Sequence, residues 1–214
     1  MLDRRRALMA QEPAAGGYIT DGLVFHLDGL IHDESSWMDT VGLKTFSPVS
    51  GTTYSWNNGL VISGGAFISS SAPIQYGTIE VVYTQPTLAT AIIAMVGNNS
   101  SVATGSGKVV VYSDGTFGFP AQGGANNGKT YTNATGQHYI AFNGTTAFAN
   151  GAEASLSNKT HSFGSFSSVM EIGRNSDKNY KFSGTIHAIR VYNRALSAAE
   201  IAYNYSVDVD RFGL

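Results

Sequence analysis

Tight-turn dipeptides spread along the whole chain constrain its fold more than any other feature of the sequence. Asn-Gly and Asp-Gly pairs supply the positive φ angles that two-residue hairpin turns require. Seven such pairs occur, at residues 21/22, 28/29, 58/59, 114/115, 127/128, 143/144 and 150/151. Because turns of this type join antiparallel neighbours, the chain is predicted to consist mainly of strands connected by hairpins.

Short segments between these turns alternate apolar and polar residues, as half-buried strands do. Leu23, Phe25 and Leu27 are expected on one face of a strand, and Ile186 and Ala188 are expected to share a face of another. Residues 79–83, 108–112, 138–142 and 170–173 have the same strand character. The pattern predicts an all-β, two-sheet antiparallel β-sandwich rather than a βαβ array, which needs a helix between successive strands.

Only two segments favour a helix. Residues 3–10 begin with Asp3, whose charge suits a helix N-terminus, and Ser197 and Glu200 have the spacing of a capping box. The second helix is expected to run from Ser197 to about Val207. Residues 13–17 (PAAGG) form the one linker, which predicts an N-terminal arm at 1–17 and a sandwich domain at 18–214.

The composition excludes several classes of protein. With 214 residues, of which 43% are hydrophobic and 13% charged, the chain can bury the core of one domain. Its net charge of -2 gives no general attraction for nucleic acid or an anionic membrane. The longest apolar run, residues 88–97, is half the roughly 20 residues that a membrane span needs. The first residues do not form a signal peptide, and the absence of cysteine leaves the compartment open.

The order of longer motifs along residues 22–212 resembles one family. GLVFHLDG (22–29) precedes the loop DESSWMDTVG (33–42), and NGLVISGGAFISS (58–70) leads into GTIEVVY (77–83). The end holds HYIAFNGTTAFANG (138–151), MEIGR (170–174) and FSGTIHAIRVYNRALSAAEIAYNY (182–205). These motifs resemble the laminin-G-like domains of the concanavalin A-like lectin and glucanase superfamily. The resemblance implies a jelly roll that binds sugars or protein surfaces, or, in part of the superfamily, hydrolyses β-glucans.

Hydrolysis of a glycoside requires two carboxylates across a cleft. The glucanases of the superfamily carry a Glu-x-Asp-x-x-Glu strand, whereas Glu80 is followed here by VVYTQ. Between residues 81 and 152 the only carboxylate is Asp114, in an Asp-Gly turn. Glu171 is the remaining candidate partner for Glu80, and nothing in the sequence brings the two together. We therefore expect no enzyme activity.

Sugar binding needs an aromatic face for the C–H surface of a sugar ring and planar polar groups for its hydroxyls. Several loops combine such side chains. The candidate ligand-binding residues are Trp37, Tyr54, Trp56, Asn126, Asn127, Tyr131, Arg174, Asn175 and Tyr180. The alternative for each loop tryptophan is a ring folded back as a plug over the end of the sandwich.

Aspartates near the first loop give a candidate metal site. Asp28 and Asp33 lie close in sequence to His26 and His32, and no thiolate or His-x-x-x-His pair favours zinc. The family often holds calcium through an aspartate and backbone carbonyls at a loop rim, so the resemblance makes calcium the candidate cofactor. The ordinary alternatives are a His-Asp hydrogen bond at a strand end and solvated turn aspartates.

The N-terminal arm carries Arg4, Arg5, Arg6 and Leu8, which could present a basic and an apolar side to another protein subunit. The alternative is an arm that folds back on its own sandwich. Free-standing laminin-G-like chains with a short basic start resemble those of phage particles and gut bacteria. The sequence thus favours a non-enzymatic carbohydrate-binding or adhesion module that binds a glycan or surface protein through its loops, displayed on a phage particle or cell surface. The alternatives are a structural decoration subunit of a virion and, third, a glycoside hydrolase.

Overall fold

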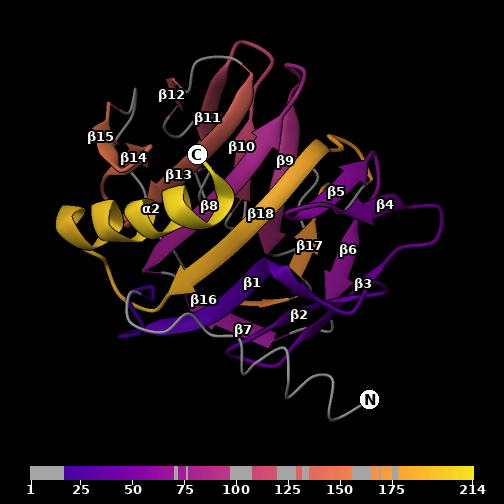
Figure 1. Ribbon diagram of the computed structural model, residues 1–214, viewed down its shortest axis with the longest axis horizontal. Coiled ribbons are helices and arrows are strands. Elements are labelled where there is room, and N and C mark those ends of the chain that lie inside the picture. The colour runs from indigo at the N-terminus through magenta and orange to yellow at the C-terminus, as the bar shows by residue number, and fades with distance from the viewer. Residues whose placement is uncertain are drawn as a thin grey trace.

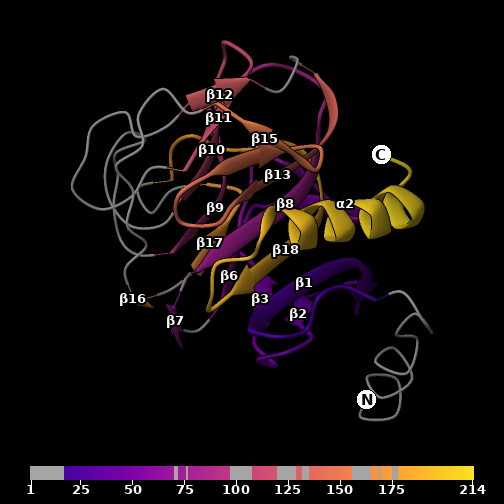
Figure 2. The ribbon, with the colours of Figure 1, turned by 90° about the vertical axis from the view of Figure 1, so that its left-hand side faces the viewer.

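The strands form two antiparallel sheets packed face to face, which confirms the predicted all-β sandwich (Figures 1 and 2). The computed structural model describes residues 17–69, 72–75, 77–96, 108–119, 129–131, 135–155, 165–168, 170–174 and 178–214. The predicted helix at residues 3–10 and the arginines of the arm lie outside these residues.

The front sheet is built around β18 (Ser183–Tyr192), which pairs with β8 on one side and with β1 and β5 on the other. Its other strands are β1 (Leu23–His32), β4 (Thr53–Trp56), β5 (Leu60–Ser63), β8 (Thr78–Gln85), β13 (Gly136–Phe142), β14 (Ala147–Ala149) and β15 (Ala152–Ala154). β4 pairs with β5, and β13, β14 and β15 continue the sheet beyond β8.

The back sheet runs from β2 to β12. In spatial order its strands are β2 (Trp37–Asp39), β3 (Thr45–Pro48), β6 (Phe67–Ser69), β17 (Met170–Ile172), β9 (Ala91–Val96), β10 (Lys108–Val111), β11 (Thr116–Gly118) and β12 (Lys129–Tyr131). β7 (Ala72–Gln75) and β16 (Ser165–Ser168) form a separate two-stranded sheet. Because β1 also pairs with β2, one continuous hydrogen-bonded path joins the two layers.

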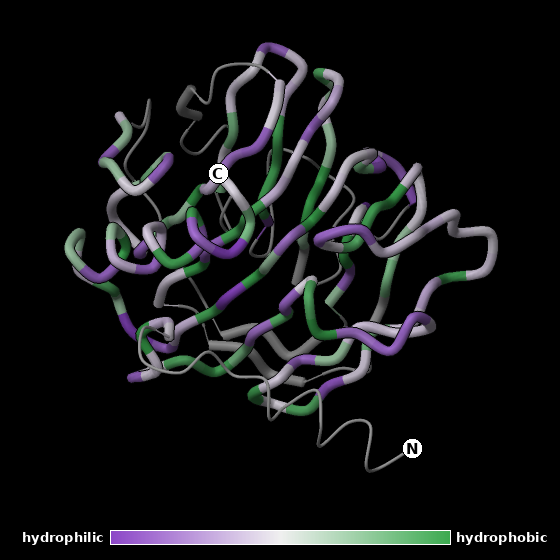
Figure 3. Tube along the Cα trace, viewed as in Figure 1, coloured by the Kyte–Doolittle hydropathy of each residue, from purple (hydrophilic) through white to green (hydrophobic). Residues whose placement is uncertain are grey.

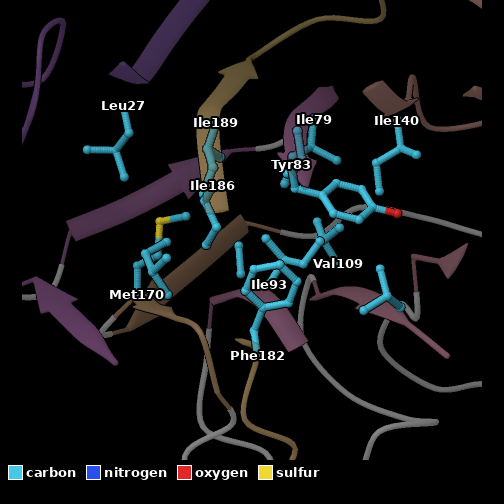
Figure 4. Close-up of a cluster of buried hydrophobic side chains, with 14 of the residues drawn as sticks. Leu27, Ile79, Tyr83, Ile93, Val109, Ile140, Met170, Phe182, Ile186 and Ile189 are labelled. Carbon is cyan, nitrogen blue, oxygen red and sulfur yellow. The ribbon is translucent and has the colours of Figure 1, made fainter. Parts of the chain in front are cut away.

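The main hydrophobic core lies between the two sheets. In Figure 4, Ile186 and Ile189 of the front sheet lie opposite Ile93 and Met170 of the back sheet. Phe25 and Leu27 of β1 also face this core, as their alternation predicts. Burial of such side chains is the dominant favourable contribution to folding.

β-Bulges change two of the predicted strand faces. An extra residue at His187 shifts the register of β18, so Ile186 faces the sandwich core while Ala188 faces the helix. A second shift follows Leu23 in β1, and Leu23 packs on the helix side, away from Phe25. The prediction that each set shares one face was wrong because a bulge reverses the alternation.

Some predicted loop and turn boundaries also differ. The Asp28-Gly29 pair lies inside β1 rather than in a turn, because Gly29 is where the strand passes against the backbone of Gly59. A Cβ atom at Gly29 would lie 2.5 Å from the Cα of Gly59. The segment after β1, predicted as a loop from 33 to 42, contains the short strand β2.

The C-terminal helix α2 (Ala198–Phe212) lies across the outer face of the front sheet (Figures 1 and 2). The predicted capping box is confirmed: Ser197 and Glu200 bond reciprocally, and Gly213 ends the helix with φ 71. The helix ends at Phe212 rather than near Val207. In Figure 3, apolar and polar residues alternate along both α2 and β18. Within the part of the chain that the structure describes, no helix is long and apolar enough to cross a membrane.

Candidate functional site

Three of the aromatic residues predicted to bind ligand gather at one end of the sandwich. The ring centroids of Trp37 and Trp56 are 5.7 Å apart, and those of Tyr54 and Trp56 are 6.5 Å apart. Trp37, however, is 0% exposed, and its Nε1 donates to the carbonyl oxygen of Asp28 at 2.7 Å. The prediction that Trp37 contacts a ligand is therefore wrong in this structure, because its ring lies in the core and packs against Trp56.

Trp56 stacks on His32, a residue that was not predicted as a ligand contact. The two rings are parallel within 4°, with centroids 4.0 Å apart. The Nε1 of Trp56 donates to the carbonyl oxygen of Glu34 at 3.0 Å, which fixes the indole against the β1–β2 loop. Both side chains are half-buried. We call His32, Tyr54 and Trp56 the aromatic shelf.

The protonation state of His32 gives the shelf a hydrogen-bond donor. The backbone N–H of Glu34 donates to the Nδ1 of His32 at 3.2 Å, so a neutral imidazole carries its proton on Nε2. Partial burial lowers the pKa of His32, which favours this neutral form. His32 thus offers one flat face and one N–H group to a ligand.

Polar residues lie near the aromatic shelf in the chain. On β4, Thr53 and Ser55 alternate with Tyr54 and Trp56, so the two exposed hydroxyls lie on the opposite face of the strand from the rings, and Asn57 follows at the surface. The β1–β2 loop is shaped by the carboxylate of Asp33, which accepts hydrogen bonds from Ser35 and Ser36. Burial opposes ionisation of Asp33, but these hydrogen bonds outweigh it and lower its pKa.

The predicted metal ligands Asp28 and Asp33 do not come together. Asp28 is 0% exposed, and its Oδ2 forms an ion pair with Arg211 of α2. Asp33 lies in the exposed loop, where both of its oxygens accept hydrogen bonds. Among the residues that the structure describes, no group of three or more His, Cys, Asp or Glu side chains could hold a metal ion. Asp28 and Asp33 thus do not form a shared carboxylate site, and calcium binding by one aspartate with backbone carbonyls stays a prediction.

The other predicted ligand residues lie at other places or outside the described residues. Arg174 follows β17 and is mostly buried, with its Nε 2.9 Å from the Oε2 of Glu171. Tyr180 is 39% exposed in the segment before β18, and its carbonyl oxygen accepts from the backbone of Ile92. Tyr131 belongs to β12, but its side chain lies outside the description, as do Asn126, Asn127 and Asn175.

The two glutamates considered for hydrolysis lie in different sheets. Glu80 of β8 points away from the sandwich core toward α2 and is 0% exposed. Its carboxylate accepts from the Nε of Arg190 at 2.6 Å, from the hydroxyl of Tyr139 at 2.6 Å and from Asn204 at 3.0 Å. Glu171 belongs to β17 of the back sheet and pairs with Arg174. The two carboxylates therefore do not face each other across a cleft.

A buried ionic cluster that was not predicted from the sequence lies between the front sheet and α2. Arg190 of β18 is 0% exposed and pairs with both Glu80 and Asp208. Burial opposes the charge of Arg190, but Asp208 and Glu80 outweigh it and raise its pKa. Asn204 bonds to Glu80 and to the hydroxyl of Tyr192. We call Glu80, Arg190, Asn204 and Asp208 the helix clasp.

One signal in the sequence could have revealed the helix clasp. The buried stripe of α2 contains Ile201, Asn204, Asp208 and Phe212, which have the spacing of one helix face. Two polar residues within an otherwise apolar stripe imply polar partners on the facing sheet. Arg190 lies on the face of β18 that points toward the helix.

Solved structures share this fold at low sequence identity. A mutant of Trypanosoma rangeli sialidase displaying trans-sialidase activity has a TM-score of 0.67 at 14% identity, covering 99% of this chain and 38% of that chain. Domain 4 of AbnA, a GH43 extracellular arabinanase from Geobacillus stearothermophilus in complex with arabinotriose, has a TM-score of 0.53 at 14% identity, covering 84% of this chain and 96% of that chain. The chain thus spans less than half of the sialidase. No curated protein sequence matches the chain.

A family model matches the part of the chain that holds β8, β13, β17, β18 and the start of α2. The model is Laminin_G_3, described as the concanavalin A-like lectin/glucanases superfamily, and it matches residues 81–202, more than half of the 214 residues. The match agrees with the two-sheet sandwich and with the motifs from 138 to 205. The chain therefore belongs to the concanavalin A-like lectin/glucanases superfamily.

Proposed function

We propose that the chain is a non-enzymatic carbohydrate-binding module whose ligand contacts the aromatic shelf. The observation that carries this proposal is the parallel stack of His32 on Trp56, 4.0 Å between centroids, with the exposed Asn57 next to Trp56 in the chain. Flat rings suit the C–H face of a sugar, and the Nε2–H of His32 and the amide of Asn57 suit its hydroxyls. The neighbouring loop adds the carboxylate of Glu34, which is exposed.

The fold comparisons support a sugar ligand without assigning one. The arabinanase domain that shares the fold was solved in complex with arabinotriose, and the chain covers nearly all of it. The sialidases carry an equivalent of this chain within a longer protein. A module displayed through another part of a larger assembly, such as a phage particle or cell surface, could use the shelf for adhesion.

The placement of acidic groups supports binding rather than hydrolysis. The carboxylate of Glu80 is fully buried and committed to Arg190, Tyr139 and Asn204, so it does not reach a substrate in this conformation. Glu171 lies in the other sheet. A retaining or inverting glycosidase needs two carboxyl groups on either side of one bond.

Binding is tested by screening the chain on a glycan array and measuring the affinity of the best ligand by calorimetry. Trp56→Ala removes the support of the stack and His32→Ala removes its outer ring, so each is expected to weaken binding by about tenfold or more. Tyr203→Ala is the matched control, because Tyr203 is an exposed aromatic residue on α2 that lies outside the shelf. Unchanged affinity in both shelf variants, with native circular dichroism, would refute the shelf as the binding site.

Catalysis is tested separately by incubating the chain with β-glucans and arabinans and measuring reducing ends. We expect the chain to release no more reducing ends than the buffer control does. Release of reducing ends by the chain that is lost in Glu80→Gln would overturn the non-enzymatic assignment. Any glycan binding would then be interpreted as substrate recognition.

A further inference from the structure

Residues 17–20 cross the outside of the helix clasp without joining either sheet. No strand pairing holds this segment, which we call the strap. The hydrogen bonds of residues 17–19 go to α2: the hydroxyl of Tyr18 donates to Asp208 at 2.6 Å, the backbone N–H of Ile19 donates to Asn204 at 3.0 Å, and the hydroxyl of Tyr203 donates to the carbonyl oxygen of Gly17 at 3.2 Å. The strap is therefore held by contacts with α2, like a peptide bound to a surface, and not by strand pairing.

The side chain of Tyr18 lies between Arg190, Arg211, His26 and Asp208, and we call the space between these four residues the cleft. The guanidinium carbon of Arg190 lies 3.9 Å from the centroid of the Tyr18 ring, and that of Arg211 lies 5.4 Å from it. The rings of His26 and Tyr18 are nearly perpendicular, with centroids 5.3 Å apart. Burial raises the pKa of the Tyr18 hydroxyl, which therefore keeps its proton and donates to Asp208. Two cations, a carboxylate acceptor and an imidazole edge thus surround one phenol.

Leaving this cleft empty is costly, because water or another group must then satisfy Asp208 and Arg190. Asp208 and Arg190 are each 0% exposed with Tyr18 in place. A buried ion that loses a partner destabilises a protein far more than an exposed one. The cleft thus favours a tyrosine, whose ring covers Arg190 and whose hydroxyl donates to Asp208, and nothing in these contacts requires that the tyrosine come from the same chain.

One β-turn alone makes the strap fold back on its own chain. The backbone N–H of Leu23 donates to the carbonyl oxygen of Thr20 at 3.1 Å, and Gly22 has φ 78. Asp21, at the corner, is bound from outside by Arg194, with 2.8 Å between Nε and Oδ2. If this turn opened, every contact of residues 17–19 could form unchanged in a second molecule, and only the turn contacts would differ between the two arrangements.

We propose that the cleft is an intermolecular binding site in which residues 17–19 of a second copy of this chain replace its own strap. The exchanged form is a two-fold dimer in which each Tyr18 donates to Asp208 of the other molecule. The intact turn favours the closed monomer at low protein concentration, because closure within one chain loses no translational freedom. Loss of the turn shifts the equilibrium to the dimer.

The test deletes residues 20 and 21, which removes the turn and keeps Tyr18. By sedimentation velocity we expect the full-length chain to be mainly monomeric and the deleted chain to be dimeric, with native circular dichroism. Adding Tyr18→Ala to the deletion is the matched control and should return a monomer. A deleted chain that stays monomeric overturns the proposal, and so does a dimer that survives Tyr18→Ala, because such a dimer uses another surface.

A second measurement keeps the proposal testable if the deleted chain fails to fold. The full-length Tyr18→Ala chain has the cleft without its tyrosine, and the probe is a synthetic peptide of residues 17–22, GYITDG. We expect this peptide to raise the melting temperature of the variant in a concentration-dependent way. A peptide with phenylalanine in place of tyrosine should bind more weakly, and one with alanine should have no effect. Equal effects of the three peptides, or no effect of any, would show that the cleft does not recognise a tyrosine in trans.

Discussion

Arg190 illustrates how much one buried residue can control in this sandwich. Its guanidinium holds two carboxylates, Glu80 and Asp208, that are themselves 0% exposed, and it lies under the ring of Tyr18. We expect Arg190→Met to lower the free energy of unfolding by about 3 to 5 kcal/mol, because two buried carboxylates lose their cation. Urea unfolding followed by circular dichroism measures this loss.

The matched control is Arg194→Met, which removes a guanidinium from the surface. Arg194 pairs with Asp21 and Glu200, but its side chain is 30% exposed, so water replaces much of the lost interaction. Arg194→Met is expected to lower the free energy of unfolding by less than about 1 kcal/mol. Equal losses in the two variants would show that the helix clasp contributes no more than an ordinary surface ion pair.

The aromatic residues at this end of the sandwich could be predicted from the sequence, but their separate roles could not. Trp37 and Trp56 each lie in a short stretch of alternating polarity, and neither stretch shows which ring fills the core and which lies at its edge. That difference depends on contacts across strands, such as the hydrogen bond from Trp37 to Asp28 and the stack of Trp56 on His32. His32 was considered only as a metal ligand, because its stacking partner lies in another strand.

The helix α2 is the element whose start the sequence defines most clearly. The side chain of Ser197 accepts from the backbone N–H of Glu200, and the carboxylate of Glu200 accepts from the backbone of Ser197 at 2.8 Å. Arg194 and Ser197 together lower the pKa of Glu200 to about 2. The cap thus combines two backbone hydrogen bonds with a charge at the positive end of the helix dipole.

We expect Ser197→Ala to lower the free energy of unfolding by about 1 kcal/mol, because the hydrogen bond to the N–H of Glu200 is lost. Ser197→Gly should cost only a few tenths of a kcal/mol. Ser206→Ala is the control, since the exposed hydroxyl of Ser206 bonds only to the carbonyl oxygen of Tyr203 within the helix. Thermal melting of the three variants gives the comparison, and a Ser206→Ala effect as large as that of Ser197→Ala would contradict a special role of the cap.

The positions of the strands could be predicted from the sequence. Which side chains of a strand face the core could be predicted only up to the first β-bulge. Residues 79–83, 108–112, 138–142 and 170–173 correspond to β8, β10, β13 and β17. The bulge at His187 has no signature in local alternation, because its imidazole satisfies partners distant in sequence. One ring nitrogen bonds to the carbonyl oxygen of Asn58, and the other lies 2.8 Å from the hydroxyl of Thr84. Tertiary contacts of this kind set where a strand changes face.

The sandwich as a whole has a second buried layer, between the front sheet and α2. The outer face of the front sheet is closed by α2 through an apolar cluster and the helix clasp. This arrangement explains why turn spacing and alternation were enough to predict the fold class, which needs only hairpins and apolar faces. It also explains why the clasp escaped prediction, since ionic partners from β8, β18 and α2 meet only after the sheet and helix have packed.

Four histidines determine how the stability of the whole molecule should depend on pH. Burial lowers the pKa of His26, His32, His138 and His187 below the ordinary value of 6.5. In the unfolded chain these groups take up protons near pH 6.5, whereas in the native state they stay neutral to lower pH. The unfolded state therefore binds more protons in this range, and stability must fall as the pH falls.

The carboxylates contribute to the pH dependence in both directions. Burial raises the pKa of Asp28 and of Asp39 above the ordinary value of 3.8, so the native state binds more protons than the unfolded state between 3.8 and the raised values. These two groups thus favour the native state on acidification, over the interval between 3.8 and their raised pKa values. Glu200 acts in the opposite direction, and its contribution is lost between its ordinary value of 4.5 and about 2.

We therefore predict that the free energy of unfolding is nearly constant above about pH 7.5 and begins to fall near pH 6.5, by up to about 1.4 kcal/mol per pH unit for each histidine that stays neutral. Urea unfolding from about pH 8 to about pH 5 measures the slope. His26→Leu removes a fully buried imidazole and should make the slope shallower, whereas His32→Gln, at the half-exposed shelf, should change it less. A free energy of unfolding that stays flat down to pH 5 would mean that the buried imidazoles are protonated in the native state as readily as in the unfolded chain. The surroundings of His26 oppose that outcome, because burial and the positive charges of Arg190 and Arg211 all disfavour an imidazolium at this position.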